Sequence, residues 1–324
     1  MKRIIGIIIC LTLIVSALAF TGCGTKKDLK LGLGVTTTVS ASSAEDKTNG
    51  IGQATTTAAA VLVDDEGKIV KAFIDCADNS VEYDATGKAI KNDSFKTKYE
   101  KGADYNMKAY GGAAKEWYEQ ADAFCALIVG KTAAEVKALV ASDYKGTQEV
   151  IDAGCTIYVS DFATAVDKAI ANATATTATE KDSIKLGVST TQTAKDATKD
   201  AAGSQEVATT FFAAAVDADG KVVAATSDCV SVTFTFDEKG ASTFDTKKAV
   251  SSKKEAGENY NMKAYGGAAK EWYEQAAAFD AACAGKTVTE IKALEVNGKG
   301  NADLQAAGCT IYISEFVKAA AKIG

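Results

Sequence analysis

The sequence contains the stretch Tyr105–Ala121, YNMKAYGGAAKEWYEQA, and repeats it without a change at Tyr260–Ala276. The two copies start 155 positions apart, which is the size of a domain and much longer than a solenoid repeat. The match extends on both sides, pairing Ala58–Cys76 with Ala213–Cys229 and Ala153–Phe162 with Ala307–Phe316. The chain therefore uses one unit twice, and we expect any function of the unit to occur in both copies.

The composition excludes several classes of chemistry. The 324 residues include no histidine, which removes imidazole general bases, the usual catalytic triads and most zinc sites. Arg3 is the only arginine, so the rest of the chain offers no bidentate clamp for phosphate. A net charge of −6 argues against a nucleic-acid partner. We expect neither an independent enzyme nor a metal site.

The N-terminus has the pattern of a targeting segment. Lys2 and Arg3 precede an apolar run from Ile4 to Phe20, and small residues lead to Cys23. This pattern predicts a lipoprotein signal peptide over residues 1–22, with Cys23 lipidated by acyl chains such as palmitate and residues 23–28 as a tether. The alternative is an uncleaved membrane anchor. Both interpretations place the protein on the membrane, at its extracytoplasmic face.

The repeat and the composition divide the remainder. We predict repeat domain 1 over residues 29–172 and repeat domain 2 over residues 184–324. Residues 173–183 between them are rich in alanine and threonine, which is typical of a linker.

Within each repeat, strand patterns come first and helix patterns last. Ala58–Val63 and Lys68–Ile74 flank an Asp-Asp-Glu-Gly turn, which predicts a β-hairpin, and Val230–Phe236 alternates as a half-buried strand does. A helix is expected over Ala113–Val129. These patterns predict the α+β class, with two tandem homologous domains, each a small antiparallel sheet with C-terminal helices packed on one side.

Finer helix signals follow from spacing. Trp117, Ala121 and Phe124 share the face expected to be buried, whereas Lys115, Glu116 and Glu119 should face water. Other signals at helix starts are two capping boxes and two serine N-caps, at Thr132 with Glu135, Thr287 with Glu290, Ser160 and Ser314.

The repeated stretch also supplies a candidate binding site. Aromatic rings beside a glycine pair can stack a planar ligand, because glycine permits close approach to the backbone. These candidates are Tyr110, Gly111 and Gly112, and in the second copy Tyr265, Gly266 and Gly267. The alternative is a turn that leads into a helix whose tryptophan belongs to the core.

The cysteines fall into two groups. Cys76 aligns with Cys229, and Cys155 aligns with Cys309, whereas Cys125 and Cys283 each occur in one copy only. An extracytoplasmic location would permit the bridges Cys76–Cys155 and Cys229–Cys309, and buried free thiols are the open alternative.

The last motif carries a resemblance. Ala153-Gly154-Cys155-Thr156, followed by Ser160 and a terminal helix, is similar to the signature Ser-Gly-Ala-Thr of the FMN-binding domain family. The hairpin VDDEGKIVKAFID also resembles the early strands of that family. The resemblance implies that Thr156 and Thr310 could carry FMN through a phosphodiester bond. A short buried strand is the alternative interpretation of Thr-Ile-Tyr-Val.

Together these observations predict a membrane-anchored extracytoplasmic lipoprotein. Its function would be that of a non-enzymatic binding or electron-carrying module for flavin or another small planar ligand. The alternative is a surface lipoprotein that has a structural or protein-interaction role and no small ligand.

Overall fold

The computed structural model describes residues 29–92 and 94–324. The predicted signal peptide, Cys23 and the tether lie outside the described residues. No helix in the part of the chain that is described is long and apolar enough to cross a membrane. The elements of the first half are β1 Lys30–Ser42, β2 Gly50–Val63, β3 Ile69–Tyr83, β4 Ala89–Ile90, α1 Lys98–Lys101, a 3-10 helix at Gly102–Tyr105, α2 Trp117–Leu127, α3 Ala133–Lys137, α4 Gln148–Asp152, α5 Ser160–Ala171 and β5 Thr174–Ala175.

The second half repeats this order with small differences. Its elements are β6 Ser183–Lys195, β7 Gly203–Val216, β8 Val222–Phe236, α6 Lys253–Ala256, a 3-10 helix at Gly257–Tyr260, α7 Met262–Gly266, α8 Trp272–Cys283, α9 Val288–Lys292, β9 Glu295–Val296, β10 Lys299–Gly300, α10 Ala302–Ala306 and α11 Ser314–Ala321.

Each half begins with a meander of three long antiparallel strands. The first sheet has the order β4-β3-β2-β1-β5, and the second has the order β6-β7-β8. The predicted hairpin is confirmed, since β2 pairs with β3 and β7 pairs with β8. The predicted strand Val230–Phe236 is the end of β8. The first strand of each meander, β1 or β6, was not predicted.

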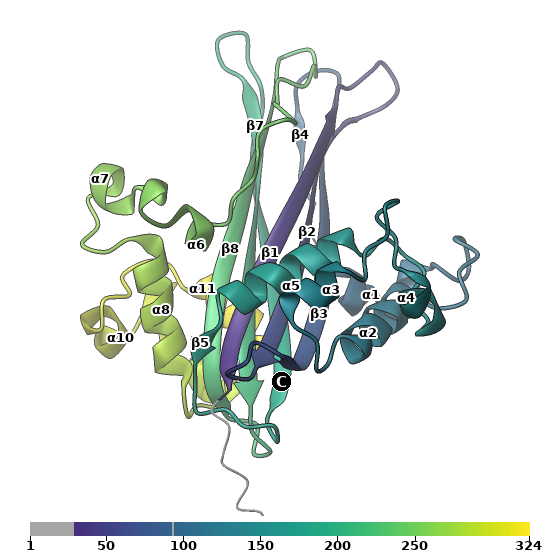
Figure 1. Cartoon of the computed structure of the whole chain (residues 1–324). Coiled ribbons are helices and arrows are strands. Elements are labelled where there is room, and N and C mark those ends of the chain that lie inside the picture. Colours follow the sequence, from purple (N-terminus) through teal and green to yellow (C-terminus); the bar gives the residue numbers. More distant parts are fainter. Residues whose placement is uncertain (1–28, 93) are drawn as a thin grey trace, which may run out of the picture.

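The chain is therefore a mixed α+β protein with antiparallel sheets, as expected. The helices of the first half contact β1, β2 and β3, and those of the second half contact β6, β7 and β8. In Figure 1 the two groups of helices flank the long strands.

The second face of each sheet packs against the other sheet. One buried apolar cluster joins Leu33, Val35 and Ala60 of the first sheet to Phe211, Val232 and Phe234 of the second. As a result, the central strands are covered on both faces, and every residue of β2 from Thr56 to Val63 is buried. The layers run helix, sheet, sheet, helix.

The contact between the sheets is reciprocal. The Ala44 N–H donates to the Gly240 carbonyl over 2.8 Å, and the Ala197 N–H donates to the Gly87 carbonyl over the same distance. Ala197 occupies in the second repeat the position of Ala44, and Gly240 occupies that of Gly87. Contacts of this kind, in which each partner makes the bond that the other makes, are typical of a two-fold axis.

The helix predictions hold with two corrections. Trp117, Ala121 and Phe124 are buried, and the capping boxes at Thr132 and Thr287 form. The helix begins at Trp117 and not at Ala113, because Glu116 is its N-cap. Glu116 was expected to face water and is only 6% exposed, since its carboxylate accepts the backbone N–H groups of Met107 and Lys108.

The serine caps are the second correction. The residues Val159 and Ile313 occupy the N-cap positions, and Ser160 and Ser314 are the first residues of α5 and α11.

The predicted linker is attached to the first sheet. Thr174–Ala175 pairs with the start of β1, and the Thr176 N–H donates to the Leu29 carbonyl over 3.0 Å. The boundaries 29–172, 173–183 and 184–324 remain predictions about folding units.

Candidate functional site

Thr156 and Thr310 lie on exposed loops just before the last helix of each half. Two positions before each threonine is a glycine whose φ is positive, 97° at Gly154 and 100° at Gly308. A side chain would be strained at these φ values, so the Gly-Cys-Thr turn depends on its glycine. The alternative of a short buried strand for Thr-Ile-Tyr-Val is wrong, since only Tyr158 makes a single bridge, to Lys145.

A buried glutamine holds each threonine. Gln120 Oε1 accepts the backbone N–H of Thr156 over 2.8 Å and its hydroxyl over 3.1 Å. Gln275 does the same for Thr310, over 2.8 Å and 3.0 Å. In this arrangement the hydroxyl proton is engaged, whereas the lone pairs of the threonine oxygen remain available.

A cavity lies beside each threonine loop, at equivalent positions of the two halves. The first cavity has a volume of about 230 Å³ and is lined by residues that include Lys98, Tyr105, Trp117, Tyr158, Asp161 and Phe162. The second cavity has a volume of about 440 Å³, and its lining includes Lys253, Tyr260, Trp272, Thr310, Tyr312 and Phe316. Thr310 lines its cavity directly, whereas in the first copy the neighbour of Thr156, Ile157, does so.

Aromatic rings and lysines form the walls. Trp117 packs against Phe162 with ring centroids 5.6 Å apart, and Trp272 packs against Phe316 at the same distance. Lys98 Nζ lies 5.2 Å from the centroid of the Tyr105 ring. Such contacts orient the ammonium group without removing its charge.

The second cavity repeats this arrangement. Lys253 Nζ lies 5.2 Å from the centroid of the Tyr260 ring and 5.7 Å from that of Trp272. A further lysine of this cavity, Lys299, has its Nζ 5.3 Å from the centroid of the Tyr312 ring, and Lys145 Nζ lies 5.7 Å from that of Tyr158 in the first repeat.

A carboxylate stands at the start of the last helix in each cavity. Burial raises the pKa of Asp161, and the charge of Lys98 opposes that rise. In the second copy Glu315 takes this place, where it accepts a hydrogen bond from the Ser189 hydroxyl over 2.6 Å and pairs with Lys318 over 2.7 Å.

The predicted glycine and tyrosine candidates lie away from these cavities. The Tyr110 side chain is 88% exposed and that of Tyr265 is 89% exposed, and neither is among the lining residues. Gly112 and Gly267 both have φ of 63°. Gly111 precedes Gly112 in a turn, and Gly266 is the last residue of α7, with Gly267 as its C-cap. The structure thus brings Thr310 to a cavity and leaves the Tyr-Gly-Gly segments on the surface.

The cysteines of the described residues are free and buried. The bridges Cys76–Cys155 and Cys229–Cys309 are therefore not formed in this structure. These four cysteines are buried free thiols, as the alternative interpretation expects. Burial raises the pKa of Cys76 to about 12 and the pKa values of Cys155 and Cys309 to about 11. Thiols with such pKa values are protonated at neutral pH and react poorly.

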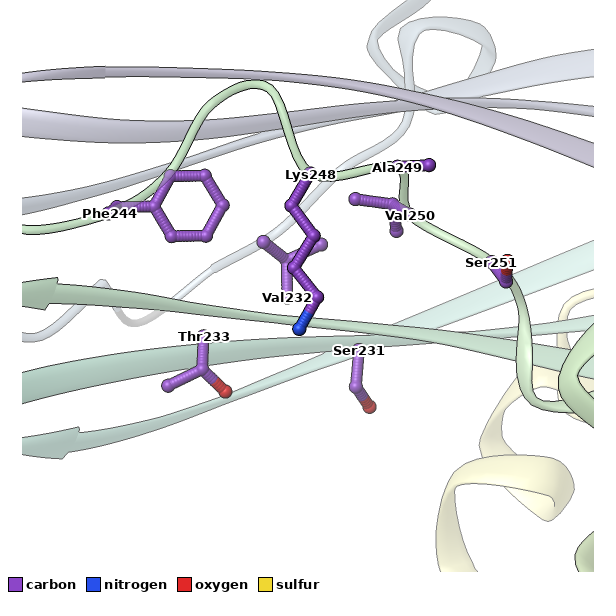
Figure 2. A pocket seen from close by; sticks show the side chains of 8 residues that line it. All are labelled: Ser231, Val232, Thr233, Phe244, Lys248, Ala249, Val250 and Ser251. Carbon is purple, nitrogen blue, oxygen red and sulfur yellow. The ribbon is translucent and has the colours of Figure 1, made fainter. Parts of the chain in front are cut away.

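A third hollow, of about 310 Å³, lies between β8 and residues 244–251. Figure 2 shows Lys248 extending from this segment over Val232, toward the strand that carries Ser231 and Thr233. The Phe244 ring closes one end by packing on Phe234, with centroids 4.7 Å apart. This hollow contains one aromatic ring, so it lacks the paired rings of the two cavities.

In comparisons with known proteins, no family model, no curated protein and no solved structure matched the chain. The resemblance to FMN-binding domains therefore rests on the sequence motif alone.

Sequence reasoning missed several residues of the cavities. Gln120, Lys98 and Tyr158 were not selected, although each has an identical residue at the equivalent position of the second repeat, in Gln275, Lys253 and Tyr312. That recurrence was the available signal. It was hard to use because structural residues such as Trp117 and Phe124 have counterparts in the second repeat as well.

Proposed function

We propose that this chain is a membrane-anchored, extracytoplasmic binding module, built from two tandem copies of one domain, which holds flavin or another small planar ligand and is not an enzyme. The observation that carries the proposal is the pair of equivalent cavities, each walled by tryptophan, phenylalanine and tyrosine rings. Binding pockets for small molecules have volumes of about 300–1,000 Å³, and the second cavity, at about 440 Å³, lies within this range.

The residues present are compatible with FMN. The ring system requires aromatic walls, which Tyr260, Trp272 and Tyr312 offer, and the phosphate requires cations, which Lys253 and Lys299 offer. The exposed hydroxyl of Thr310 lines the same cavity. FMN bound there would supply electron-carrying chemistry, while the protein residues bind and orient it.

The test is a titration of the protein starting at residue 24 with FMN and with riboflavin. Binding should quench the fluorescence of Trp117 or Trp272, because both tryptophans line the cavities. Trp272→Phe and Trp117→Phe identify the cavity that responds. If neither flavin changes the fluorescence or sediments with the protein, flavin binding is wrong.

Attachment of FMN is tested separately. Co-expression with an extracytoplasmic flavin transferase should yield yellow protein heavier by one FMN per modified threonine, and Thr156→Ala and Thr310→Ala should remove the label. A colourless product of unmodified mass would contradict covalent attachment. Reversible binding is decided by the titration described above.

A second function is favoured by a different observation. Tyr110, Tyr144, Tyr265 and Tyr312 expose between 66% and 89% of their side chains, and exposed tyrosines are frequent at protein interfaces. A surface lipoprotein that contacts another protein would use these side chains. This alternative has no small ligand, so flavin titrations would show no binding, and Tyr110→Ala and Tyr265→Ala would abolish partner capture.

A further inference from the structure

The two cavities share their aromatic walls but differ in charge. In the first repeat, Lys98 Nζ lies 3.7 Å from Asp78 Oδ2, and the two side chains are only 16% and 20% exposed. Asp78 follows Cys76 by two positions on β3. At the same place after Cys229, on β8, the second repeat has Ser231. The carboxylate that pairs with Lys98 therefore has no counterpart at this position beside Lys253.

The environment of Asp78 keeps it ionised. Burial opposes its ionisation, but hydrogen bonds from Thr55 and Gln53 and the charge of Lys98 together hold the pKa of Asp78 below its usual value. Thr55 donates over 2.8 Å and Gln53 over 2.7 Å to the same oxygen, Oδ1. The first cavity thus contains a compensated lysine and, in Asp161, a further carboxyl group.

The cations of the second cavity are not compensated in this way. Within the described part of the chain, Lys253 forms no ion pair with a carboxylate. The carboxylate that raises its pKa is Glu206, which stands where the first repeat has Gln53 and forms no ion pair with Lys253. The carboxylate in this lining, Glu315, is already paired with Lys318. Lys299 also lines the second cavity, whereas its counterpart Lys145, over the ring of Tyr158, is not among the lining residues of the first.

Size and access differ in the same direction. The second cavity is larger, about 440 Å³ against about 230 Å³, and it reaches the threonine hydroxyl. A buried or half-buried cation next to aromatic faces attracts an anion more strongly than a lysine that already has a carboxylate partner, because less charge is compensated within the protein.

We propose that the second cavity is the ligand site of this chain, and that its ligand is a planar ring bearing a phosphate or carboxylate group that pairs with Lys253. The first cavity, with the Lys98–Asp78 pair, does not bind the same ligand at comparable concentration. This inference rests on the proposed binding function and assigns it a ligand class and a single site.

The experiment uses residues 24–324, which lack only the predicted signal peptide and Cys23, and two probes that share a ring system. FMN carries a phosphate and riboflavin does not. Isothermal titration should give one site per chain and a tighter dissociation constant for FMN. Lys253→Met should weaken FMN binding by about ten- to hundredfold, the range expected for loss of a charge-assisted contact, and should leave riboflavin binding nearly unchanged.

Exchange of the differing residue provides the matched controls. Ser231→Asp introduces in the second repeat the carboxylate of the first, and it should weaken FMN binding as Lys253→Met does. Lys98→Met should have no effect on FMN binding. Circular dichroism and thermal unfolding of each variant verify that the fold is retained.

Three outcomes would overturn the inference. Two equivalent sites, an equal effect of Lys98→Met and Lys253→Met, or equal affinity for FMN and riboflavin would each leave a binding module but contradict the assigned site or charge. Binding of neither probe would instead reject the proposed flavin-binding function itself, so the two failures can be distinguished.

Discussion

Tyr83 and Phe236 occupy equivalent positions in the two repeats and stack on each other, with ring centroids 4.1 Å apart and ring planes inclined by 7°. Each ends the third strand of its meander and is fully buried. The local two-fold axis therefore passes between one residue and its own counterpart, as it does at the centre of a symmetric dimer.

This stack should couple the two sheets energetically. Tyr83→Ala and Phe236→Ala should each lower the free energy of unfolding by about 3–5 kcal/mol, because each removes a buried aromatic side chain. The double variant should fall short of the sum by about 0.5–1.5 kcal/mol, the usual coupling of an aromatic pair. Urea unfolding of the four proteins measures this, with exposed Tyr110→Ala as a control. Strict additivity would mean that the rings do not interact.

Isolated repeats test the shared core. The sequence predicts that residues 29–172 and 184–324 each fold alone. Each isolated fragment would expose its side of the buried cluster between the sheets, so we expect it to associate with a second copy of itself. Analytical ultracentrifugation should find dimers. Phe211→Asp in the second fragment should give monomers, because it places a charge in that cluster. Monomeric, cooperatively unfolding wild-type fragments would show that the sheet contact is dispensable.

The state of the cysteines can be read by alkylation. The native protein should react slowly, because burial keeps the thiols protonated, with the pKa of Cys76 at about 12. After unfolding without reductant, the six cysteines at positions 76, 125, 155, 229, 283 and 309 should all be labelled. Protection of Cys76, Cys155, Cys229 and Cys309 in the unfolded protein would establish the two bridges instead.

Asp280 should make the stability depend on pH. Burial raises the pKa of this carboxyl to about 6, while hydrogen bonds from Ser227 and the charge of Lys254 oppose the rise. Between the unfolded pKa near 4 and about 6 the folded state holds the extra proton, so stability falls as the pH rises through this window. Above about pH 6 the loss is complete.

The matched variant is Asp280→Asn, which cannot ionise. It should remove a loss on the order of 2–3 kcal/mol between pH 4 and 6, measured by urea unfolding at several pH values. Asp75 and Asp228, whose pKa values burial also raises to about 6, should retain their share of the pH dependence. An unchanged pH profile would show that Asp280 is not protonated in the native protein.

The proposed lipid anchor can be tested at Cys23. Cys23→Ala should release the protein into the medium or leave an unprocessed precursor, as cell fractionation and intact mass would show. Retention of a normally cleaved Cys23→Ala product in the membrane would contradict lipidation at this residue.

The sequence predicted the local elements better than the way they assemble. The turn at Asp64–Gly67, the strand at Val230–Phe236 and the capping box at Thr132 follow from short-range rules, and each is confirmed. The contact between the sheets had a signal that was not used. The runs AAAVLV at Ala58–Val63 and FFAAAV at Phe211–Val216 do not alternate, which is the pattern of a strand buried on both faces.

The cavities were harder to predict because their residues come from distant segments. A sequence motif indicates Thr310. Lys253 and Trp272 belong to other helices and reach the same cavity only because those helices pack on β8. Tyr110 and Gly111 were selected for their chemistry, and their segment turns outward because Glu116 fixes its backbone from the other side. Spacing along the chain carries no information about that direction.

The reciprocal bonds of Ala44 with Gly240 and of Ala197 with Gly87 have a consequence for how this protein can evolve. In a dimer made from one gene, a substitution alters both subunits together. Here the two halves share one chain, so their association does not depend on dilution, and either half can mutate alone. Aspartate at 78 and serine at 231 are such a divergence. One repeat can therefore change its binding properties while the other keeps the residues that maintain the fold.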